Sequence, residues 1–375
     1  MKLFFISKCA NWQKYRLEVL TKLAETYGYD VEILTTGKLK PYLQANHVVK
    51  YKIFNSIFPQ KFSFSLMPGI LKYIIKNKPD VVLCLNNSTQ LTEYLALMLC
   101  KLIGVRFVWW THGFDHAVSK KPTILKILKE KYVLFFLNQS DSIITFSDKG
   151  RDYLISKGIP AKKIVTALNT MDTDKILKIK NKYVDKKHSI KEQFGFEISD
   201  RLLVFTGRLT KEKKIDHAIL ACQQLQSEFP NLKLIIIGNG SELTYLKKLA
   251  EDIDFKNVQF LGEIYDEEIL SQWLLISDIY IMPAYVGLGI IHAFCYGLPI
   301  LTEEDDSHGP CIQYLKDGKN GYMVKRDNIV ELSSKVKELL SDETKLDLFS
   351  EEAFNTVLNE GSVNSMIYNM HRALI

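Results

Sequence analysis

The chain has 375 residues, of which 47% are hydrophobic and 25% are charged, and its formal net charge is +6. This composition is typical of globular proteins and excludes a disordered or collagen-like chain, and the length suggests two domains. The charge is uneven, because residues 1–180 hold 28 Lys and Arg against 13 Asp and Glu, whereas residues 181–375 hold 21 against 30. The basic first half predicts contact with a polyanion.

The first half predicts strands that alternate with amphipathic helices. Its strand-like runs are Lys2–Ser7, Asp30–Thr35, Asp80–Leu85, Arg106–Trp110 and Ser142–Phe146. The segment Gln13–Tyr27 has the apolar spacing of a helix. Strands separated by helices form parallel sheets, so we expect a βαβ domain. The N-terminal run has only four consecutive apolar residues, which predicts a strand and not a signal peptide.

The sequence also excludes two classes of protein. No apolar run reaches the roughly 20 residues that are needed to cross a bilayer, so we expect a cytoplasmic protein. The six cysteines are scattered, and none forms a C-x-x-C pair or a cluster with zinc-ligand spacing. We therefore expect reduced core thiols and no structural zinc.

The segment Asp172–Asp200 is rich in Lys, Asp and Glu without a sustained apolar face, which favours an interdomain linker. A second βαβ series follows it. Its strands are Leu202–Phe205, Leu232–Ile237, Val258–Leu261, Asp278–Met282, Pro299–Thr302 and Asn320–Val324, and its helices include Asp216–Glu228, Glu242–Asp252 and Ile290–Tyr296.

These series predict an α/β protein with two Rossmann-like, doubly wound parallel-sheet domains that face a central cleft. Ligands of such sheets bind at the carboxyl ends of the strands. We expect an N-terminal domain over residues 1–175 and a C-terminal domain over residues 176–355. A helix in residues 356–375 is expected to return to the N-terminal domain.

The most informative loop follows the strand Asp278–Met282 and leads into the helix Ile290–Tyr296. Pro283 ends the strand, and Gly287 and Gly289 allow backbone N–H groups to approach a ligand closely. The N-terminus of the helix directs unpaired N–H groups at the same place. This loop predicts a site for an anionic group.

A second loop, Thr206–Asp216, follows the first strand of the C-terminal domain. Arg208 and Lys213 can project from it, and a guanidinium with an ammonium can neutralise a diphosphate leaving group. A solvated basic turn is the alternative. The strand Leu232–Ile237 ends in Gly238-Asn-Gly240, which without a third glycine is better explained as a tight strand-to-helix turn. The glycine-free loop Ser7–Asn11 argues against a nicotinamide site.

Four motifs follow one another in the second half of the chain: a G-R-L-x-x-x-K loop, a strand with G-x-G, a Pro-x-x-x-G-x-G loop and Tyr-Gly-x-Pro. In this order they resemble the donor-binding half of retaining glycosyltransferases of family 4, which have the GT-B fold. The run from Ile144-Thr-Phe-Ser147 to Asn169-Thr-Met-Asp172 is similar to the end of that family's first domain. The resemblance covers most of residues 140–325. It implies that Arg208 and Lys213 bind the donor phosphates. The donor-binding residues that it implies are Gly207, Gly238, Gly240, Tyr285, Val286, Gly287, Leu288, Gly289, Ile290 and His292.

The resemblance adds a catalytic histidine from the other domain. His112, in Trp110-Thr-His-Gly113, resembles a histidine that reaches the donor sugar from the opposite wall of the cleft. A partly exposed loop histidine is the alternative. His308-Gly-Pro-Cys311 lies where the family's loop approaches the nucleotide, and a simple turn explains it equally well.

The sequence departs from the family at one place. Two glutamates, eight residues apart, usually flank the cradle, but here His292 stands at the second position and Ala284 or Val286 at the first. We interpret the chain as a divergent subgroup in which main-chain groups or residues 303–306 make the sugar contacts. Loss of activity is the alternative, although such a relative would be expected to lose Arg208 and Lys213 as well.

The resemblance implies a retaining, metal-independent hexosyltransferase that needs no cofactor. Its donor would be a nucleotide-diphosphate sugar, with UDP or GDP favoured. Its acceptor would be a sugar or a lipid-linked oligosaccharide in the synthesis of bacterial-type surface polysaccharide. A nucleotide-sugar epimerase or hydrolase of the same fold and a catalytically silent nucleotide-sugar binding protein are the alternatives. No recognisable nucleic-acid-binding module is present.

The basic half also predicts a contact with a membrane. Lys120–Phe136 mixes lysines with aliphatic and aromatic residues, and Ile57–Met67 is unusually apolar for a loop. Together they suit a peripheral surface on the anionic inner face of a membrane. A core helix with a solvated basic face is the alternative.

Overall fold

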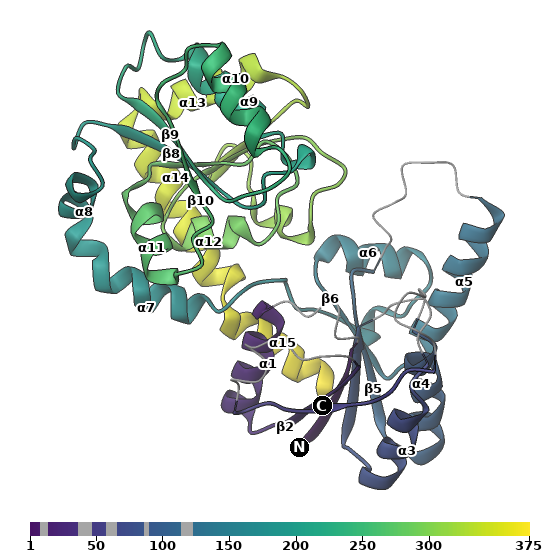
Figure 1. Cartoon of the computed structure of the whole chain (residues 1–375). Helices are drawn as coiled ribbons and strands as arrows, with labels where there is room; N and C mark the ends of the chain where they lie inside the picture. Colours follow the sequence, from purple (N-terminus) through teal and green to yellow (C-terminus); the bar gives the residue numbers. More distant parts are fainter. Residues whose placement is uncertain (8–13, 37–46, 58–65, 86–89, 114–122) are drawn as a thin grey trace. The chain divides into compact units, whose positions relative to one another are not determined.

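The computed structural model describes residues 1–7, 14–36, 47–57, 66–85, 90–113 and 123–375 (Figure 1). The chain forms two compact units. Met1–Met171 and Val363–Ile375 make up the first unit, and Asp172–Ser362 makes up the second. Each unit is described by itself.

The first unit is built on a seven-stranded parallel sheet with the order β3-β2-β1-β4-β5-β6-β7. Its strands are β1 (Lys2–Ile6), β2 (Asp30–Thr35), β3 (Lys50–Ile53), β4 (Val81–Leu85), β5 (Arg106–Thr111), β6 (Ser142–Thr145) and β7 (Ile164–Thr166). The five predicted strands are present. The two edge strands β3 and β7 were not predicted, because they are short and β3 is largely exposed.

Helices cover both faces of this sheet, which is why its central strands are apolar throughout. The helices are α1 (Lys14–Tyr27), α3 (Pro68–Asn77), α4 (Leu91–Ile103), α5 (Ile124–Gln139), α6 (Asp148–Ser156) and α15 (Val363–Leu374). One face packs on α1 and α15, and the other packs on α3, α4, α5 and α6.

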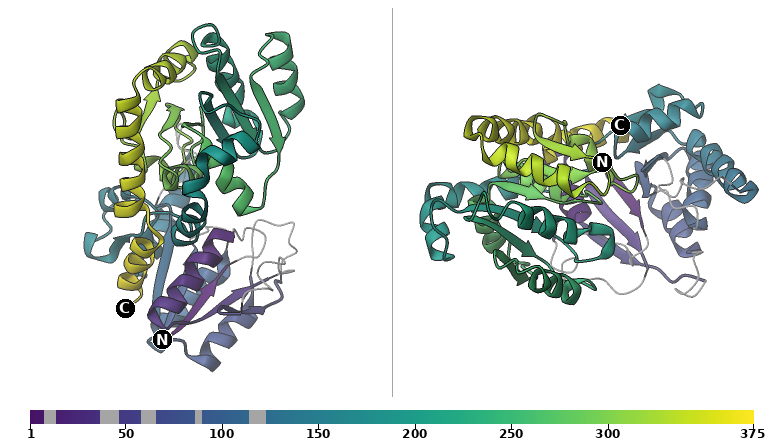
Figure 2. Two further views of the ribbon diagram at one scale, coloured as in Figure 1. Left: turned by 90° about the vertical axis from the view of Figure 1, so that its left-hand side faces the viewer. Right: turned by 90° about the horizontal axis from the view of Figure 1, so that it is seen from above.

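The last helix of the chain belongs to this first unit. Helix α15 lies beside α1 (Figure 2) and buries Met366, Ile367 and Met370 against the sheet. The ring of His371 stacks on Tyr27 at 4.1 Å, and its Nδ1 lies 2.8 Å from the hydroxyl of Tyr29. The chain therefore leaves the first unit after residue 171 and returns to it at residue 363.

The second unit has a six-stranded parallel sheet with the order β10-β9-β8-β11-β12-β13. Its strands are β8 (Arg201–Thr206), β9 (Leu232–Ile237), β10 (Val258–Gly262), β11 (Ile279–Ile281), β12 (Ile300–Glu303) and β13 (Gly321–Val324). The sequence predicted all six. Both units are thus α/β layers around a doubly wound parallel sheet, as predicted.

The helices of the second unit are α7 (Thr173–Tyr183), α8 (Lys187–Gln193), α9 (Ile215–Gln224), α10 (Leu243–Asp252), α11 (Glu267–Ile276), α12 (Gly289–Cys295), α13 (Ile329–Leu340) and α14 (Glu343–Thr356). The expectation of a linker over 172–200 was wrong, because α7 and α8 pack against α11 and α7 also packs against α12. Only a few residues of the segment 172–200, including Thr173, Ile176 and Ile190, are buried. Its apolar pattern was therefore too sparse to predict the two helices.

The strand order fixes where a ligand can bind in the second unit. The chain moves outward in one direction from β8 to β10 and then starts again on the other side of β8 with β11. The loops after β8 and β11 therefore diverge and leave room at the carboxyl edge of the sheet, where open α/β sheets bind their ligands. These are the two loops that the sequence singles out.

Candidate active site

The loops after β8 and β9 are joined through their backbones. The amide of Gly207 donates to the carbonyl of Ile237 at 3.0 Å, and the amide of Leu209 donates to the carbonyl of Asn239 at 2.9 Å. Gly238 has φ +145°, and a Cβ there would lie 1.8 Å from the carbonyl oxygen of Gly207. A Cβ on Gly240 would similarly lie 2.2 Å from a carbonyl oxygen, that of Leu209. The two glycines of the G-x-G motif therefore permit this close approach of the two loops.

Lys213 links the loop after β8 to the loop after β11. It closes the short 3-10 turn Lys211–Lys213, and its Nζ donates to the carbonyl oxygen of Tyr285 at 2.6 Å. The same ammonium lies 4.6 Å from the centre of the Tyr285 ring. Burial, and next to it the charge of Arg208, lower the pKa of Lys213 to about 8. Arg208 itself is exposed, so two cations of this loop are close enough to interact, and one of them is partly dehydrated.

The loop after β11 presents a row of backbone amides. Among the described residues, no acceptor is found for the amides of Gly287, Leu288 and Gly289, whereas the amide of Ile290 already turns back to Gly287. A Cβ on Gly287 would meet nothing within 4 Å. Three successive donors, with open space at Gly287, are suited to bind an anionic oxygen.

The residues that lead into this row are held in an unusual conformation. Tyr285 has φ +47°, although it is not a glycine, and its side chain is exposed. Such a conformation costs about 1 to 2 kcal/mol and needs support from its surroundings. Ala284 and Val286 on either side are fully buried, so neither side chain faces the loop's exterior.

His308 braces this loop from the loop after β12. Its Nδ1 accepts the amide hydrogen of Val286 at 3.0 Å, so the ring proton is on Nε2, which donates to the carbonyl of Glu303 at 2.8 Å. The amide of Gly309 donates to the carbonyl of Val286 at 2.9 Å. Burial lowers the pKa of His308 below its usual value, which favours the neutral ring that this geometry requires. The structure thus gives His308 a structural role that the sequence did not suggest.

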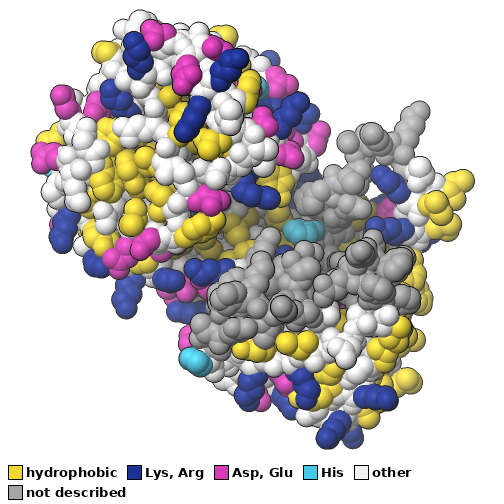
Figure 3. Space-filling view, viewed as in Figure 1, with side chains coloured by type: hydrophobic (Ala, Val, Ile, Leu, Met, Phe, Trp, Pro, Cys, Tyr) yellow, Lys and Arg dark blue, Asp and Glu magenta, His cyan; other side chains and the backbone are white. Residues whose placement is uncertain are grey.

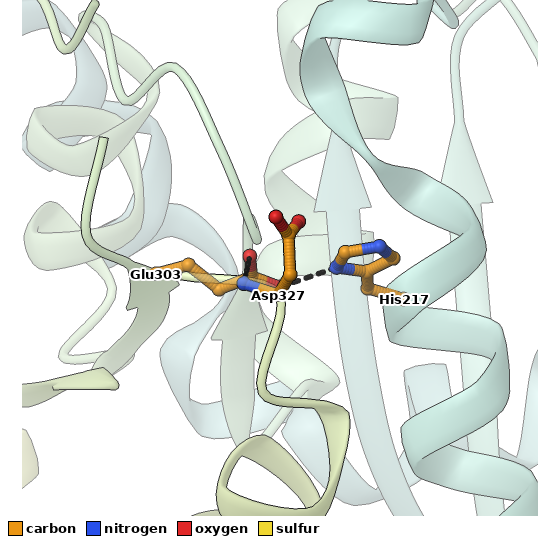
Figure 4. Close-up of side chains that lie close together, drawn as sticks. All are labelled: His217, Glu303 and Asp327. Carbon is orange, nitrogen blue, oxygen red and sulfur yellow. Dashed lines mark hydrogen bonds and ion pairs between the residues drawn. The ribbon is translucent and has the colours of Figure 1, made fainter. Parts of the chain in front are cut away.

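Glu303, at the end of β12, is the centre of a buried polar cluster. Its side chain is fully buried and accepts from the amide of Asp327 at 2.8 Å and from Lys214 Nζ at 3.1 Å. Figure 4 shows His217 facing it, and His217 Nδ1 lies 2.5 Å from Glu303 Oε1. The suggestion that Glu303 contacts the sugar is therefore wrong for this carboxylate, because its oxygens are buried and already hydrogen-bonded.

The charges of this cluster stabilise one another. Burial alone would raise the pKa of Glu303, but His217, the amide of Asp327 and Lys214 together lower it. The hydrogen bond to Glu303 raises the pKa of His217 in return. In the described part of the chain, His217, Glu303 and Asp327 form the one group of side chains with the spacing of metal ligands. The ammonium of Lys214, which lies 2.5 Å from Asp327 Oδ1, already provides a cation there.

His292, which the resemblance predicts at the second glutamate position, lies on α12. Its side chain is buried, and Nε2 lies 2.9 Å from Oε1 of Glu267 at the start of α11. Its ring centre is 5.8 Å from that of Tyr296, one turn further along the helix. The imidazole is therefore placed between two helices, next to a carboxylate that the sequence did not single out.

The remaining candidate, His112, belongs to the first unit. It follows β5, is half-buried, and lies with its ring centre 4.5 Å from that of Phe146. Gly113 has φ +85°, and a Cβ there would lie 2.6 Å from the carbonyl oxygen of Gly150. The turn that carries His112 is thus packed against the start of α6. The loop 7–11 lies, except for Ser7, outside the described residues.

Family comparisons agree with this arrangement of two domains. Residues 186–356 match the model of the family "Glycosyl transferases group 1", and residues 14–175 match "Glycosyltransferase Family 4". Each half of the chain is a glycosyltransferase domain. The β8 and β11 loops, the His308 brace and the Glu303 cluster all lie within the group 1 match, and His112 lies within the other.

Individual relatives extend over most of this glycosyltransferase. An uncharacterized glycosyltransferase of Haemophilus influenzae is 23% identical over 87% of this chain and 86% of its own length. The alpha-monoglucosyldiacylglycerol synthase of Acholeplasma laidlawii is 26% identical over 82% of this chain and 80% of its own. The crystal structure of Anabaena HepE in complex with UDP has a TM-score of 0.76 at 17% identity and covers 100% of this chain and 99% of that one. The fold is therefore GT-B.

No helix among the described residues is both long and apolar enough to cross a bilayer. The five described cysteines, Cys84, Cys100, Cys222, Cys295 and Cys311, are buried free thiols, as expected, and Cys9 lies outside the described residues.

The sequence missed the residues that support the two loops. Lys214, His217 and Asp327 were not singled out, since Lys214 and Asp327 occur in polar stretches that are typical of solvated turns and His217 lies within a predicted helix. No local sequence pattern marks these three residues, because their shared partner Glu303 lies far away in the chain.

Proposed function

We propose that this glycosyltransferase transfers a hexosyl group from a nucleotide-diphosphate sugar, with UDP or GDP as the nucleotide, and retains the configuration at the anomeric carbon. The observation that carries the proposal is the row of amides from Gly287 to Gly289 together with Lys213 and Arg208. Amides and two cations at the carboxyl edge of the sheet suit a diphosphate, whose charge rises as the glycosidic bond breaks.

In this proposal the ammonium of Lys213 moves from the carbonyl of Tyr285 to a phosphate oxygen. A partly buried ammonium interacts with developing charge more strongly than a fully hydrated one. Arg208 adds a planar fork of donors to the same leaving group. Departure of the diphosphate and attack by the acceptor take place on the same face of an oxocarbenium-like sugar, without a metal ion or other cofactor.

The donor sugar and nucleotide would be held mainly by the main chain. In this proposal His292 and either Ala284 or Val286 replace the family's two carboxylates, and the side chains of Ala284 and Val286 are buried. We infer that the amides of the cradle take over the sugar contacts, that His292 lies beside the ribose, and that His112 is a further catalytic residue. Gly207, Gly238 and Gly240 would contribute by shaping the loop that carries Arg208.

The acceptor would be a sugar or a lipid-linked oligosaccharide at the cytoplasmic face of a membrane, in the synthesis of a surface polysaccharide or glycoconjugate. One relative is named as a synthase of alpha-monoglucosyldiacylglycerol, a glycosylated lipid, which supports a lipid-containing acceptor here. The basic composition of the first 180 residues supports the same proposal.

If the glutamate pair is replaced as proposed, a binding protein without turnover is the second candidate. The experiment that separates the candidates incubates the chain with UDP-, GDP-, ADP- and TDP-sugars and records both the melting temperature and the release of nucleoside diphosphate. The proposal predicts a melting shift with one donor and nucleotide release that increases with a sugar acceptor. A melting shift without any release would support the binding protein, and no shift with any donor would contradict both. Release that is fast without an acceptor would indicate the epimerase or hydrolase.

A further inference from the structure

Helices α4 and α5 of the first unit lie side by side on one face of its sheet. The ring of Tyr94 on α4 lies 5.1 Å from Tyr132 and 4.8 Å from Phe136, both on α5. Lys101 on α4 donates to the side-chain oxygen of Gln139 at the end of α5 at 2.9 Å. The inner sides of both helices belong to the apolar core of this face. The two helices therefore present one common outer surface.

That outer surface is apolar, which is unusual for helices that already have a buried side. On α4 the side chains of Met98 and Leu102 are exposed, and Leu102 is 84% exposed. On α5 the exposed positions follow helical spacing, with Leu125 at 78% and Leu128 at 57%. We name this the α4–α5 surface; its main members are Met98, Leu102, Ile124, Leu125, Leu128 and Phe135. Figure 3 shows hydrophobic side chains gathered along the edge where Figure 1 labels these helices.

The exposed charges of these helices are positive. Lys101, Lys126, Lys129 and Lys131 are exposed. Of the two acidic residues, Glu93 is buried, and Glu130 is paired with Lys157 at 2.5 Å and with the hydroxyl of Tyr153 at 2.6 Å. On a helical projection, Lys129 and Lys131 flank the stripe of Ile124, Leu128 and Phe135 on its two sides. An apolar stripe with lysines on both margins is the pattern of a helix that lies in a membrane interface.

We propose that the α4–α5 surface binds an anionic lipid bilayer, with the apolar side chains at the boundary of the acyl chains and the lysines among the headgroups. Charge complementarity selects this partner, because an uncharged apolar partner would leave the lysines without counter-charges. Helix α5 has 16 residues and carries lysines on its exposed side, so it would lie along the interface and not cross it. The inference concerns where the protein docks and does not depend on the proposed reaction.

The test is flotation of the full chain with phosphatidylcholine vesicles and with vesicles that also contain phosphatidylglycerol, in the absence of any donor. We expect binding to the anionic vesicles that weakens as salt is added. The variant Leu125→Glu/Leu128→Glu places two carboxylates in the surface and should reduce binding at least roughly tenfold. Both positions are exposed, so its melting temperature should stay that of the wild type.

Two further variants separate the apolar and charged contributions. Leu348→Glu on α14 of the second unit changes a leucine of similar exposure, 60%, and should bind vesicles as the wild type does. Changing Lys129 and Lys131 to Gln should weaken binding by roughly fivefold for each lysine and reduce its dependence on salt.

Two outcomes would overturn the inference. One is equal vesicle binding by the wild type and by Leu125→Glu/Leu128→Glu. The other is a dimer that forms without vesicles and is lost in that variant, which would assign the surface to a second copy of the chain. Nucleotide release with a water-soluble sugar acceptor does not need a membrane, so its failure would count against the proposed reaction and not against this surface.

Discussion

The ammonium nitrogen of Lys213 lies 2.6 Å from the carbonyl oxygen of Tyr285, which connects the loop after β8 to the loop after β11. These loops start on neighbouring strands at the point where the order of the sheet reverses. The contact brings the ammonium of Lys213 next to a residue that precedes the row of amides from Gly287 to Gly289. A diphosphate bound as proposed would compete with this carbonyl oxygen for the ammonium of Lys213.

The first prediction concerns the protonation of Lys213. Its pKa is about 8 because of burial and the charge of Arg208, and a bound diphosphate would raise it again. Donor binding should therefore take up a proton at about pH 9, where free Lys213 is mostly neutral, and almost none at about pH 6. Calorimetry in buffers of different ionisation enthalpy measures this uptake. Lys213→Met should abolish it, and equal uptake in this variant would show that another group is responsible.

The second prediction compares two glycines. Gly238→Ala would bring a Cβ to 1.8 Å from the carbonyl oxygen of Gly207 and would force a strained φ, so the loops must separate. We expect a fall in unfolding free energy of roughly 3 kcal/mol or more, as for other severe backbone clashes. Gly287→Ala is the control, because its Cβ would meet nothing within 4 Å. Equal stability of the two variants in urea denaturation would contradict the described contact.

The third prediction concerns the His308 brace. Because burial lowers its pKa, the folded state binds this proton less readily than the unfolded state, and the contribution of the neutral ring is lost as pH falls below about 6.5. At neutral pH, His308→Ala should lower the unfolding free energy by about 1 to 2 kcal/mol through two lost hydrogen bonds. The difference between wild type and variant should shrink in acid. A difference that grows as pH falls would be incompatible with the neutral ring.

The fourth prediction concerns the Glu303 cluster. Glu303→Ala leaves His217 and Lys214 without their buried partner and should lower the unfolding free energy by roughly 3 kcal/mol. Asp306→Asn is the matched control, since the Asp306 side chain is 92% exposed and should matter little. The contribution of His217 to stability depends on pH in the opposite direction to that of His308. Its raised pKa means that its contribution is present below about pH 6.5 and is lost as pH rises through the folded-state pKa.

Much of the fold could be predicted, because buried parallel strands give continuous apolar runs. Leu232–Ile237 was predicted with the bounds that it has, and Asp30–Thr35 likewise. Elements with little burial were missed, namely β3, β7 and the helices α7 and α8. The strand β7 is only three residues long, and the sequences of β3, α7 and α8 resemble polar loops because few of their side chains contact the core.

The candidate site was predicted at the level of loops but not at the level of side-chain contacts. Glycine spacing and the position of basic residues indicated both loops, since these features follow from local backbone requirements. The partners of Glu303 come from positions 86 and 24 residues away, and no local pattern reveals such pairs. For the same reason the sequence suggested that Glu303 was available to a ligand, whereas the structure buries it.

The most direct test of the account measures Arg208→Ala and Lys213→Ala against the wild type. Binding of UDP and GDP by calorimetry and release of nucleotide from the matching sugar donor are recorded for each purified, folded protein. We predict that one nucleotide binds, that each substitution weakens binding, and that each lowers turnover by roughly 10² to 10³, as for removal of a group that stabilises the transition state. Wild-type binding and turnover in both variants would contradict it.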